Sequence, residues 1–206
     1  MERYPLSKTE YGIYVEQMTA RNTAYNNPFT VDLPDDVDIE RLRAAVRTVV
    51  AAHPYLKTGF GVDENGDVYK FTFNCGAETE VEVIHTDRFD VREYVRPFDL
   101  GSELLFRFFI IITPERKLLF SDVHHIIYDG ASFGVLARQI NDAYNGLPVE
   151  KESFTANDVA MEEQARLASD EYVKAREYYL DLFDGVDTDT ELFCQFLLIL
   201  YHGAEM

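Results

Sequence analysis

The residues best suited to chemistry form one short string, HHIIYDG at residues 124–130. Histidine has an unperturbed pKa of about 6.5, so its imidazole can accept and donate protons near neutral pH. The string lies between an apolar segment with a strand pattern, 117–123, and a segment with a helical pattern, 132–144. Because a sheet holds its strand ends rigidly, residues at such a junction are well placed for catalysis. The spacing therefore predicts a general base on a rigid platform.

The individual residues of this string allow several roles. Neighbouring side chains of a strand point to opposite faces, so His124 and His125 should lie in different environments if both are extended. Asp129 could orient an imidazole, cap the following helix, or form half of a buried ion pair. Gly130 permits a backbone turn and a close approach by substrate. The residues themselves do not decide among the roles of Asp129.

Other chemistries fit the sequence less well. A zinc site needs three or four ligands at a spacing that brings them together, and Cys75 and Cys194 are single and far apart. A serine triad would need a Gly-x-Ser-x-Gly turn, which the sequence lacks. We therefore expect acid–base chemistry with no metal ion.

The hydrophobic pattern predicts a two-layer α/β sandwich, since helices and strands follow one another in mixed order. The apolar run 104–113 suits a central strand that is covered on both faces. Helices are expected at about 8–20, 38–52, 132–145, 155–168 and 170–183, with a short one near 91–95. Strands are expected at about 28–33, 55–62, 68–74, 80–85, 104–113 and 117–123.

The composition restricts the partners. The chain has 19 Lys and Arg against 37 Asp and Glu, a net charge of −18, and therefore lacks the basic footprint of a nucleic-acid-binding protein. Arg88, Arg92 and Arg96 recur at a helix-like spacing, which marks either a docking patch for an acidic partner or a solvated helix face.

Cysteine usage and hydropathy suggest a compartment. Two cysteines without a framework fit a reducing cytoplasm, and residues 1–5 lack the apolar core of a signal peptide. The apolar run 192–201 is about half as long as a membrane span. We expect a cytoplasmic protein. Its apolar run should pack on the rest of the chain, or on a second copy in a homodimer, and should not lie in a membrane.

Three motifs, in order, resemble the condensation domains of nonribosomal peptide synthetases, which belong to a superfamily that includes chloramphenicol acetyltransferase. HHIIYDG resembles the signature His-His-x-x-x-Asp-Gly. Residues 6–14, LSKTEYGIY, resemble the opening motif, with Glu10 in place of its glutamine. Residues 53–60, HPYLKTGF, resemble His-Glu-x-Leu-Arg-Thr-x-Phe, with Pro54 and Lys57 replacing the glutamate and the arginine.

This resemblance implies a chloramphenicol-acetyltransferase-like half domain, whose mixed, largely antiparallel sheet is covered by helices. It implies an N-terminal lobe at 1–187, with the C-terminal lobe absent. Residues 188–206 form an apolar tail that does not resemble the family's crossover into that lobe, and this tail is either a truncated or non-native end or a native tail. The implied reaction forms an amide bond between acyl or aminoacyl thioesters, which carrier proteins hold on phosphopantetheine. Carrier domains and the missing lobe are the implied partners. No cofactor is bound directly, and an isolated lobe is expected to be inactive.

The resemblance also suggests roles for the motif. His125 would accept a proton from the acceptor amine or hold that amine in place, and His124 would pack inward. Asp129 would keep the shape of the loop by pairing with a basic residue such as Lys57 or Arg47. Gly130 would leave room for the pantetheine arm and present its N–H to the oxyanion.

Three alternatives share the motif or the fold. They are an epimerization domain, a stand-alone acyltransferase and a non-catalytic docking remnant. A cyclization domain is disfavoured, because that branch replaces the histidines with aspartates.

Overall fold

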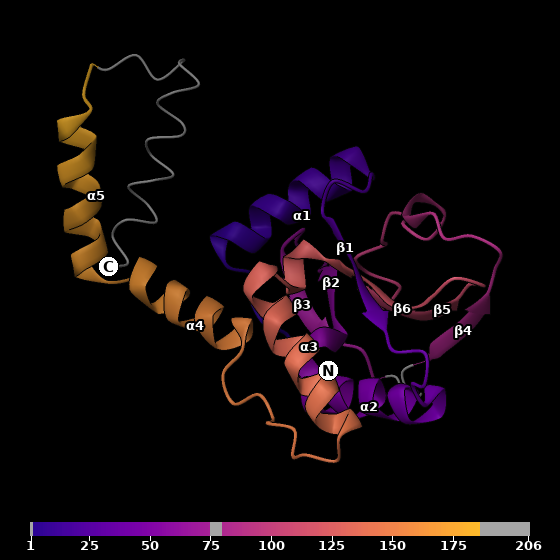
Figure 1. Cartoon of the computed structure of the whole chain (residues 1–206). Coiled ribbons are helices and arrows are strands. Elements are labelled where there is room, and N and C mark those ends of the chain that lie inside the picture. The colour runs from indigo at the N-terminus through magenta and orange to yellow at the C-terminus, as the bar shows by residue number, and fades with distance from the viewer. Residues whose placement is uncertain (1, 75–79, 186–206) are drawn as a thin grey trace. The chain divides into compact units, whose positions relative to one another are not determined.

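The computed structural model describes residues 2–74 and 80–185, and Figure 1 shows the elements along this part of the chain. The helices are α1 (Lys8–Ala20), α2 (Ile39–Ala52), α3 (Gly130–Tyr144), α4 (Ala156–Leu167) and α5 (Asp170–Leu182). The strands are β1 (Asn26–Leu33), β2 (Thr58–Val62), β3 (Val68–Thr72), β4 (Val81–His85), β5 (Phe106–Ile112) and β6 (Lys117–His124). Short 3-10 helices are η1 (Pro54–Lys57), η2 (Val91–Glu93) and η3 (His125–Ile127). Internal contacts divide the chain into two units, residues 1–163 and 164–206.

The first unit is built on a four-stranded sheet with the order β1-β6-β5-β4. Strand β6 is antiparallel to both β1 and β5, whereas β4 runs parallel to β5. Strands β2 and β3 form a separate antiparallel hairpin. The predicted mixed, largely antiparallel sheet is confirmed.

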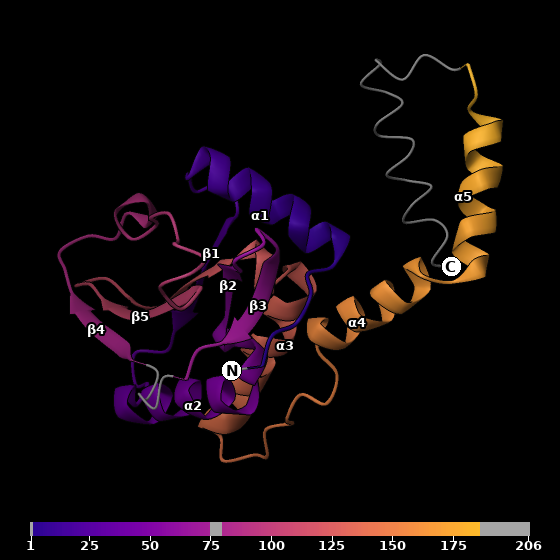
Figure 2. The same ribbon diagram turned by 180° about the vertical axis from the view of Figure 1, so that it is seen from behind.

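Helices cover one face of this sheet. Helix α2 begins after Asp38, whose carboxylate accepts a hydrogen bond from the Arg41 amide at 3.0 Å. Helices α2 and α3 lie side by side in Figures 1 and 2. Their apolar side chains pack with those of β5 and β6 into the larger core, which includes Val46, Val49, Val50, Leu136, Ile140, Phe108, Ile110 and Val123.

The connection from β4 to β5 covers the opposite face. Its aromatic side chains pack on Ile111, Leu118 and Phe120. Strand β5 is therefore buried on both faces, as its apolar sequence predicted. A sheet covered in this way holds the end of β6 rigidly.

Three local predictions were wrong in detail. The strand expected from residue 55 starts only at Thr58, because Pro54 begins the 3-10 helix η1 and fixes its φ angle. The short helix near 91–95 is the three-residue η2. Helix α3 starts at Gly130 rather than at Ser132, since Asp129 caps it.

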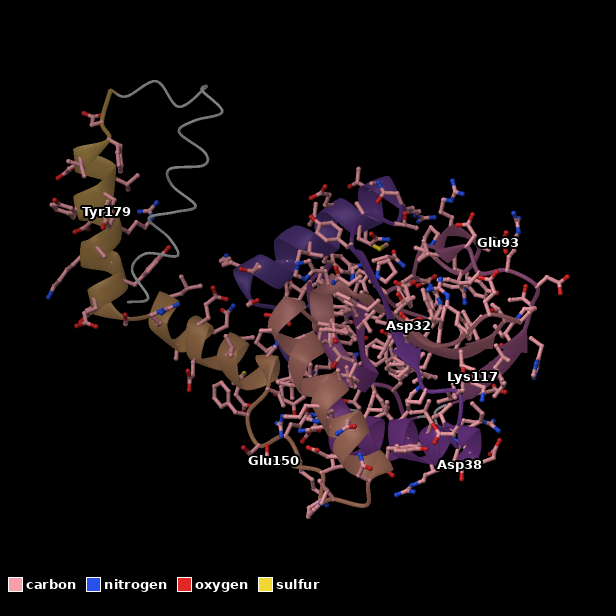
Figure 3. The ribbon with its side chains drawn as sticks, viewed as in Figure 1. Asp32, Asp38, Glu93, Lys117, Glu150 and Tyr179 are labelled. Carbon is pink, nitrogen blue, oxygen red and sulfur yellow. The ribbon has the colours of Figure 1, made fainter. Side chains whose placement is uncertain are left out.

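The helix-like spacing of Arg88, Arg92 and Arg96 does not produce a basic face, because the segment contains only the short helix η2. Each guanidinium lies within 3.2 Å of a carboxylate oxygen, in the pairs Arg88–Glu93, Arg92–Asp90 and Arg96–Glu103. Acidic side chains stand at the surface, as the exposed and labelled Asp32, Asp38, Glu93 and Glu150 show in Figure 3.

Among the described helices, none is long and apolar enough to cross a membrane. The apolar run 192–201 and the proposed tail 188–206 lie outside the described residues.

A buried ion pair anchors the first of the two N-terminal motifs, and a hydrogen bond to the same carboxylate joins it to the second. The ammonium of Lys70, a fully buried residue, lies 2.8 and 2.9 Å from the Glu10 carboxylate oxygens and donates to the Ala156 carbonyl at 3.0 Å. The Tyr55 hydroxyl donates to the same carboxylate at 2.7 Å. The carboxylate of Glu10 is therefore buried together with a cation from β3 that neutralises it.

We expect Lys70→Met to lower the free energy of unfolding by about 3–5 kcal/mol, because it leaves the Glu10 carboxylate buried without its cation. Adding Glu10→Gln should restore most of this loss, since a neutral amide needs no counter-charge. Urea unfolding followed by circular dichroism measures both. Asp32→Asn, which removes an exposed pair with Arg116, is the control and should change little. A Lys70→Met protein as stable as the wild type would contradict the role of this pair.

Candidate active site

Strand β6 ends at His124, which is fully buried. Its ring packs against the rings of Tyr25 and Phe98, with centroids 5.9 Å away in both cases. Its Nδ1 accepts a hydrogen bond from the Ile126 amide at 3.2 Å, so the ring proton is on Nε2. Burial, with a smaller contribution from His125, lowers the pKa of His124 to about 4. At neutral pH this imidazole is therefore uncharged.

His125 begins η3 and is exposed. Its backbone N–H donates to the Tyr25 carbonyl at 2.8 Å, which fixes the start of the turn. Its Nδ1 lies 2.9 Å from the Tyr128 carbonyl oxygen. Because a carbonyl only accepts, Nδ1 carries the proton and Nε2 keeps its lone pair. This is the tautomer that a general base requires.

Asp129 caps α3. Its Oδ1 accepts hydrogen bonds from the Ser132 amide at 2.8 Å and the Ser132 hydroxyl at 2.6 Å. These hydrogen bonds, the one from the hydroxyl first, lower the pKa of the exposed carboxyl group. The expected buried ion pair with Lys57 or Arg47 is therefore wrong. The physical reason is that the free N–H groups of the first helical turn satisfy this carboxylate locally.

Gly130 is the first residue of α3. It is not among the glycines with positive φ, and a Cβ atom built there would meet nothing within 4 Å. The backbone turn therefore does not require glycine, contrary to one expectation from the sequence. What the glycine provides is open space beside Asp129.

A family model for the condensation domain matches residues 1–195. The chain belongs to the condensation domain family. The resemblance drawn from the three motifs is confirmed.

The relatives of this condensation-domain chain are nonribosomal peptide synthetases. Bacitracin synthase 3 of Bacillus licheniformis is 31% identical over 192 residues, which cover 89% of this chain and 3% of the synthase. Surfactin synthase subunit 1 of Bacillus subtilis (strain 168) is 32% identical over 190 residues, which cover 89% of this chain and 5% of that subunit.

Solved condensation domains share its fold. The starter condensation domain of rhizomide synthetase has a TM-score of 0.75 at 17% identity, covering 91% of this chain and 49% of that one. The first condensation domain of the calcium-dependent antibiotic synthetase, in complex with substrate analogue 2a, has a TM-score of 0.71 at 22% identity, with the same coverage. The chloramphenicol-acetyltransferase-like fold is confirmed, and the chain spans about half the length of these domains.

A buried ion pair that was not predicted from the sequence lies beside the condensation motif. Asp122 is fully buried two residues before His124, and its Oδ2 accepts from Arg107 Nη1 at 3.0 Å and from Asn26 Nδ2 at 2.7 Å. Arg107 interrupts an otherwise apolar strand sequence. That single charge was the available signal, because a buried cation needs a partner.

Two cavities flank α3. One, of about 450 Å³, lies between β1, β6 and α3, and includes Phe133 and Ser121. The other, of about 410 Å³, is bordered by η1, η3 and residues 152–159, and includes Tyr128. Within the described part of the chain, no group of three or more His, Cys, Asp or Glu residues could hold a metal ion. The second cavity borders the motif at Ile127 and Tyr128, whereas no residue of the motif lines the first.

The capping role of Asp129 predicts a modest effect of mutation. Asp129→Ala should lower the free energy of unfolding by about 0.5–2 kcal/mol, as expected for loss of a helix N-cap rather than of a buried ion pair. Asp38→Ala removes the corresponding cap of α2 and is the matched control, expected to have a similar effect. A much larger loss for Asp129→Ala in urea unfolding would argue for an ion pair.

The depressed pKa of His124 predicts a pH dependence. In the folded state His124 stays uncharged above about pH 4, whereas the unfolded imidazole takes up a proton near pH 6.5. His124 therefore contributes stability at neutral pH, and this stability is lost as the pH falls from about 6.5 to about 4. Between about pH 7 and pH 5 the loss should be on the order of 2 kcal/mol. His124→Asn should remove this component from urea unfolding curves. His85→Asn, at an exposed histidine, should retain it. Equal pH dependence in both variants would refute the assignment.

Proposed function

We propose that this chain is the N-terminal lobe of a nonribosomal peptide synthetase condensation domain, acting in amide-bond formation. The observation that carries the proposal is the fixed tautomer of His125, with Nδ1 held by the Tyr128 carbonyl and the Nε2 lone pair available. Condensation domains are acyltransferase-type enzymes, which agrees with a base at this position.

In the proposed reaction, the amine of the acceptor attacks the carbonyl carbon of the donor thioester. The C–N bond forms, the C–S bond breaks, and the pantetheine thiolate leaves. His125 Nε2 takes the proton from the attacking nitrogen and returns it to the thiolate, so no net proton is consumed. His124 supports the turn from inside, Asp129 holds the start of α3, and the space beside Gly130 admits the pantetheine arm.

The substrates in this proposal arrive on carrier proteins. Both thioesters would be attached to phosphopantetheine, and the chain itself would bind no cofactor. The apolar walls of the cavities beside α3 suit acyl or amino-acid side chains.

The proposed lobe comprises residues 1–187, with 188–206 as its tail. The chain covers 49% of the solved domains, and in this proposal a second lobe forms the other wall of the site. Positioning two substrates supplies about 7–11 kcal/mol of barrier lowering, far more than one base alone. We therefore expect the isolated chain to be inactive.

The test combines this chain with donor- and acceptor-loaded carrier proteins and a C-terminal lobe from a related synthetase, with the amide product measured by mass spectrometry. Product should form only when both lobes are present, and His125→Ala should lower its rate by about 10²–10⁴-fold. His85→Ala is the control and should leave the rate unchanged. An undiminished rate for His125→Ala would overturn the assigned base. Epimerised substrate without amide product would identify an epimerization domain instead.

A further inference from the structure

Four buried polar side chains gather on one face of the sheet, directly behind the catalytic motif. Asp122 and His124 are two residues apart on β6 and therefore share a face. Asn26 on β1 is the register partner of His124, and Arg107 on β5 is the register partner of Asp122. All four are at most 9% exposed.

In this cluster, the buried atoms that have no hydrogen-bond partner include both donors and acceptors. Asp122 Oδ2 is satisfied by Arg107 and Asn26. Two acceptors, Asp122 Oδ1 and Asn26 Oδ1, and two donors, Arg107 Nε and His124 Nε2, have no partner among the described protein atoms. His124 Nε2 is a donor because Nδ1 accepts from the Ile126 amide. Two donors and two acceptors on one buried face match the bonding capacity of water, which donates and accepts.

We propose that this cluster is a binding site for ordered water, which bridges His124 Nε2–H to the free oxygens of Asp122 and Asn26. The bridge fixes the ring orientation of His124. That ring holds the Ile126 amide, and through it the turn that begins at His125. Asp122 and Asn26 are therefore positioning residues for the motif. The water site is independent of the proposed function. Only the effect of the water site on catalysis rests on the proposed function.

Direct evidence would come from a high-resolution crystal structure of the chain. It should show a water within hydrogen-bond distance of His124 Nε2 and of an oxygen of Asp122 or Asn26. A well-defined electron-density map with no water at this position would overturn the proposal. This test uses the unmodified chain and therefore does not depend on the folding of a variant.

Solution NMR of the 206-residue chain provides the second test. The imidazole ¹⁵N signals should show His124 protonated on Nε2, with this proton exchanging slowly at neutral pH. Asn26→Leu removes the Oδ1 acceptor of the bridge and the hydrogen bonds of Nδ2 to Asp122 and the Arg96 carbonyl, so it should speed that exchange at least about tenfold without changing the signals of His85. Ser121→Ala is the matched control, because Ser121 adjoins Asp122 on the opposite face of β6 and lines a cavity. Unchanged exchange in a folded Asn26→Leu protein would contradict the bridge.

The catalytic consequence has its own readout. In the two-lobe assay, Asn26→Leu should lower kcat about tenfold and leave KM unchanged, since the variant loosens the motif without touching substrate. Failure of the assay in the wild type would disprove the proposed function and leave the NMR result standing. A raised KM with an unchanged kcat would contradict this role and show that Asn26 contacts substrate instead.

Discussion

The pairing of β6 with a strand on each side sets the position of every candidate catalytic group. Strand β6 hydrogen-bonds to β1 and β5 along its full length, and its residues from Leu118 to His124 are buried. His124, the last residue of β6, is buried, whereas His125, the next residue, is exposed. The boundary between core and surface therefore falls between two identical side chains, and this boundary gives them different accessibility.

Two kinds of interaction then act on the motif. Local backbone groups determine its details, since the Tyr128 carbonyl selects the tautomer of His125 and the first turn of α3 satisfies Asp129. Long-range contacts determine its location, since Arg107 on β5 neutralises the buried Asp122. The local contacts are hydrogen bonds at the edge of the core, whereas the long-range pair is embedded in the sheet.

Much of this arrangement follows from the sequence because it depends on neighbours along the chain. The helix expected from residue 8 starts there, where Ser7 and Glu10 form a capping box, and the apolar run around Arg107 predicted a strand covered on both faces. The function of Asp129 did not follow, because the same carboxylate serves equally well as a cap or as an ion-pair partner. The pairing of Arg107 with Asp122 depends on strand register, and nothing in either strand sequence specifies it. Likewise, the sequence shows Glu10 but not that Lys70 faces it from β3.

The topology also affects how the chain reaches this structure during synthesis. Strand β1 emerges early, yet its partner is β6, with Asn26 paired to His124 about 100 residues later. Until then the growing chain carries β1 as an unpaired strand, which neighbouring chains on a polysome could recruit. Pro28 lacks an amide hydrogen and Asp32 is charged and exposed, so β1 is a poor template for such pairing. The sequence of β1 thus protects this edge strand from intermolecular pairing until β6, which ends at His124, has been synthesised.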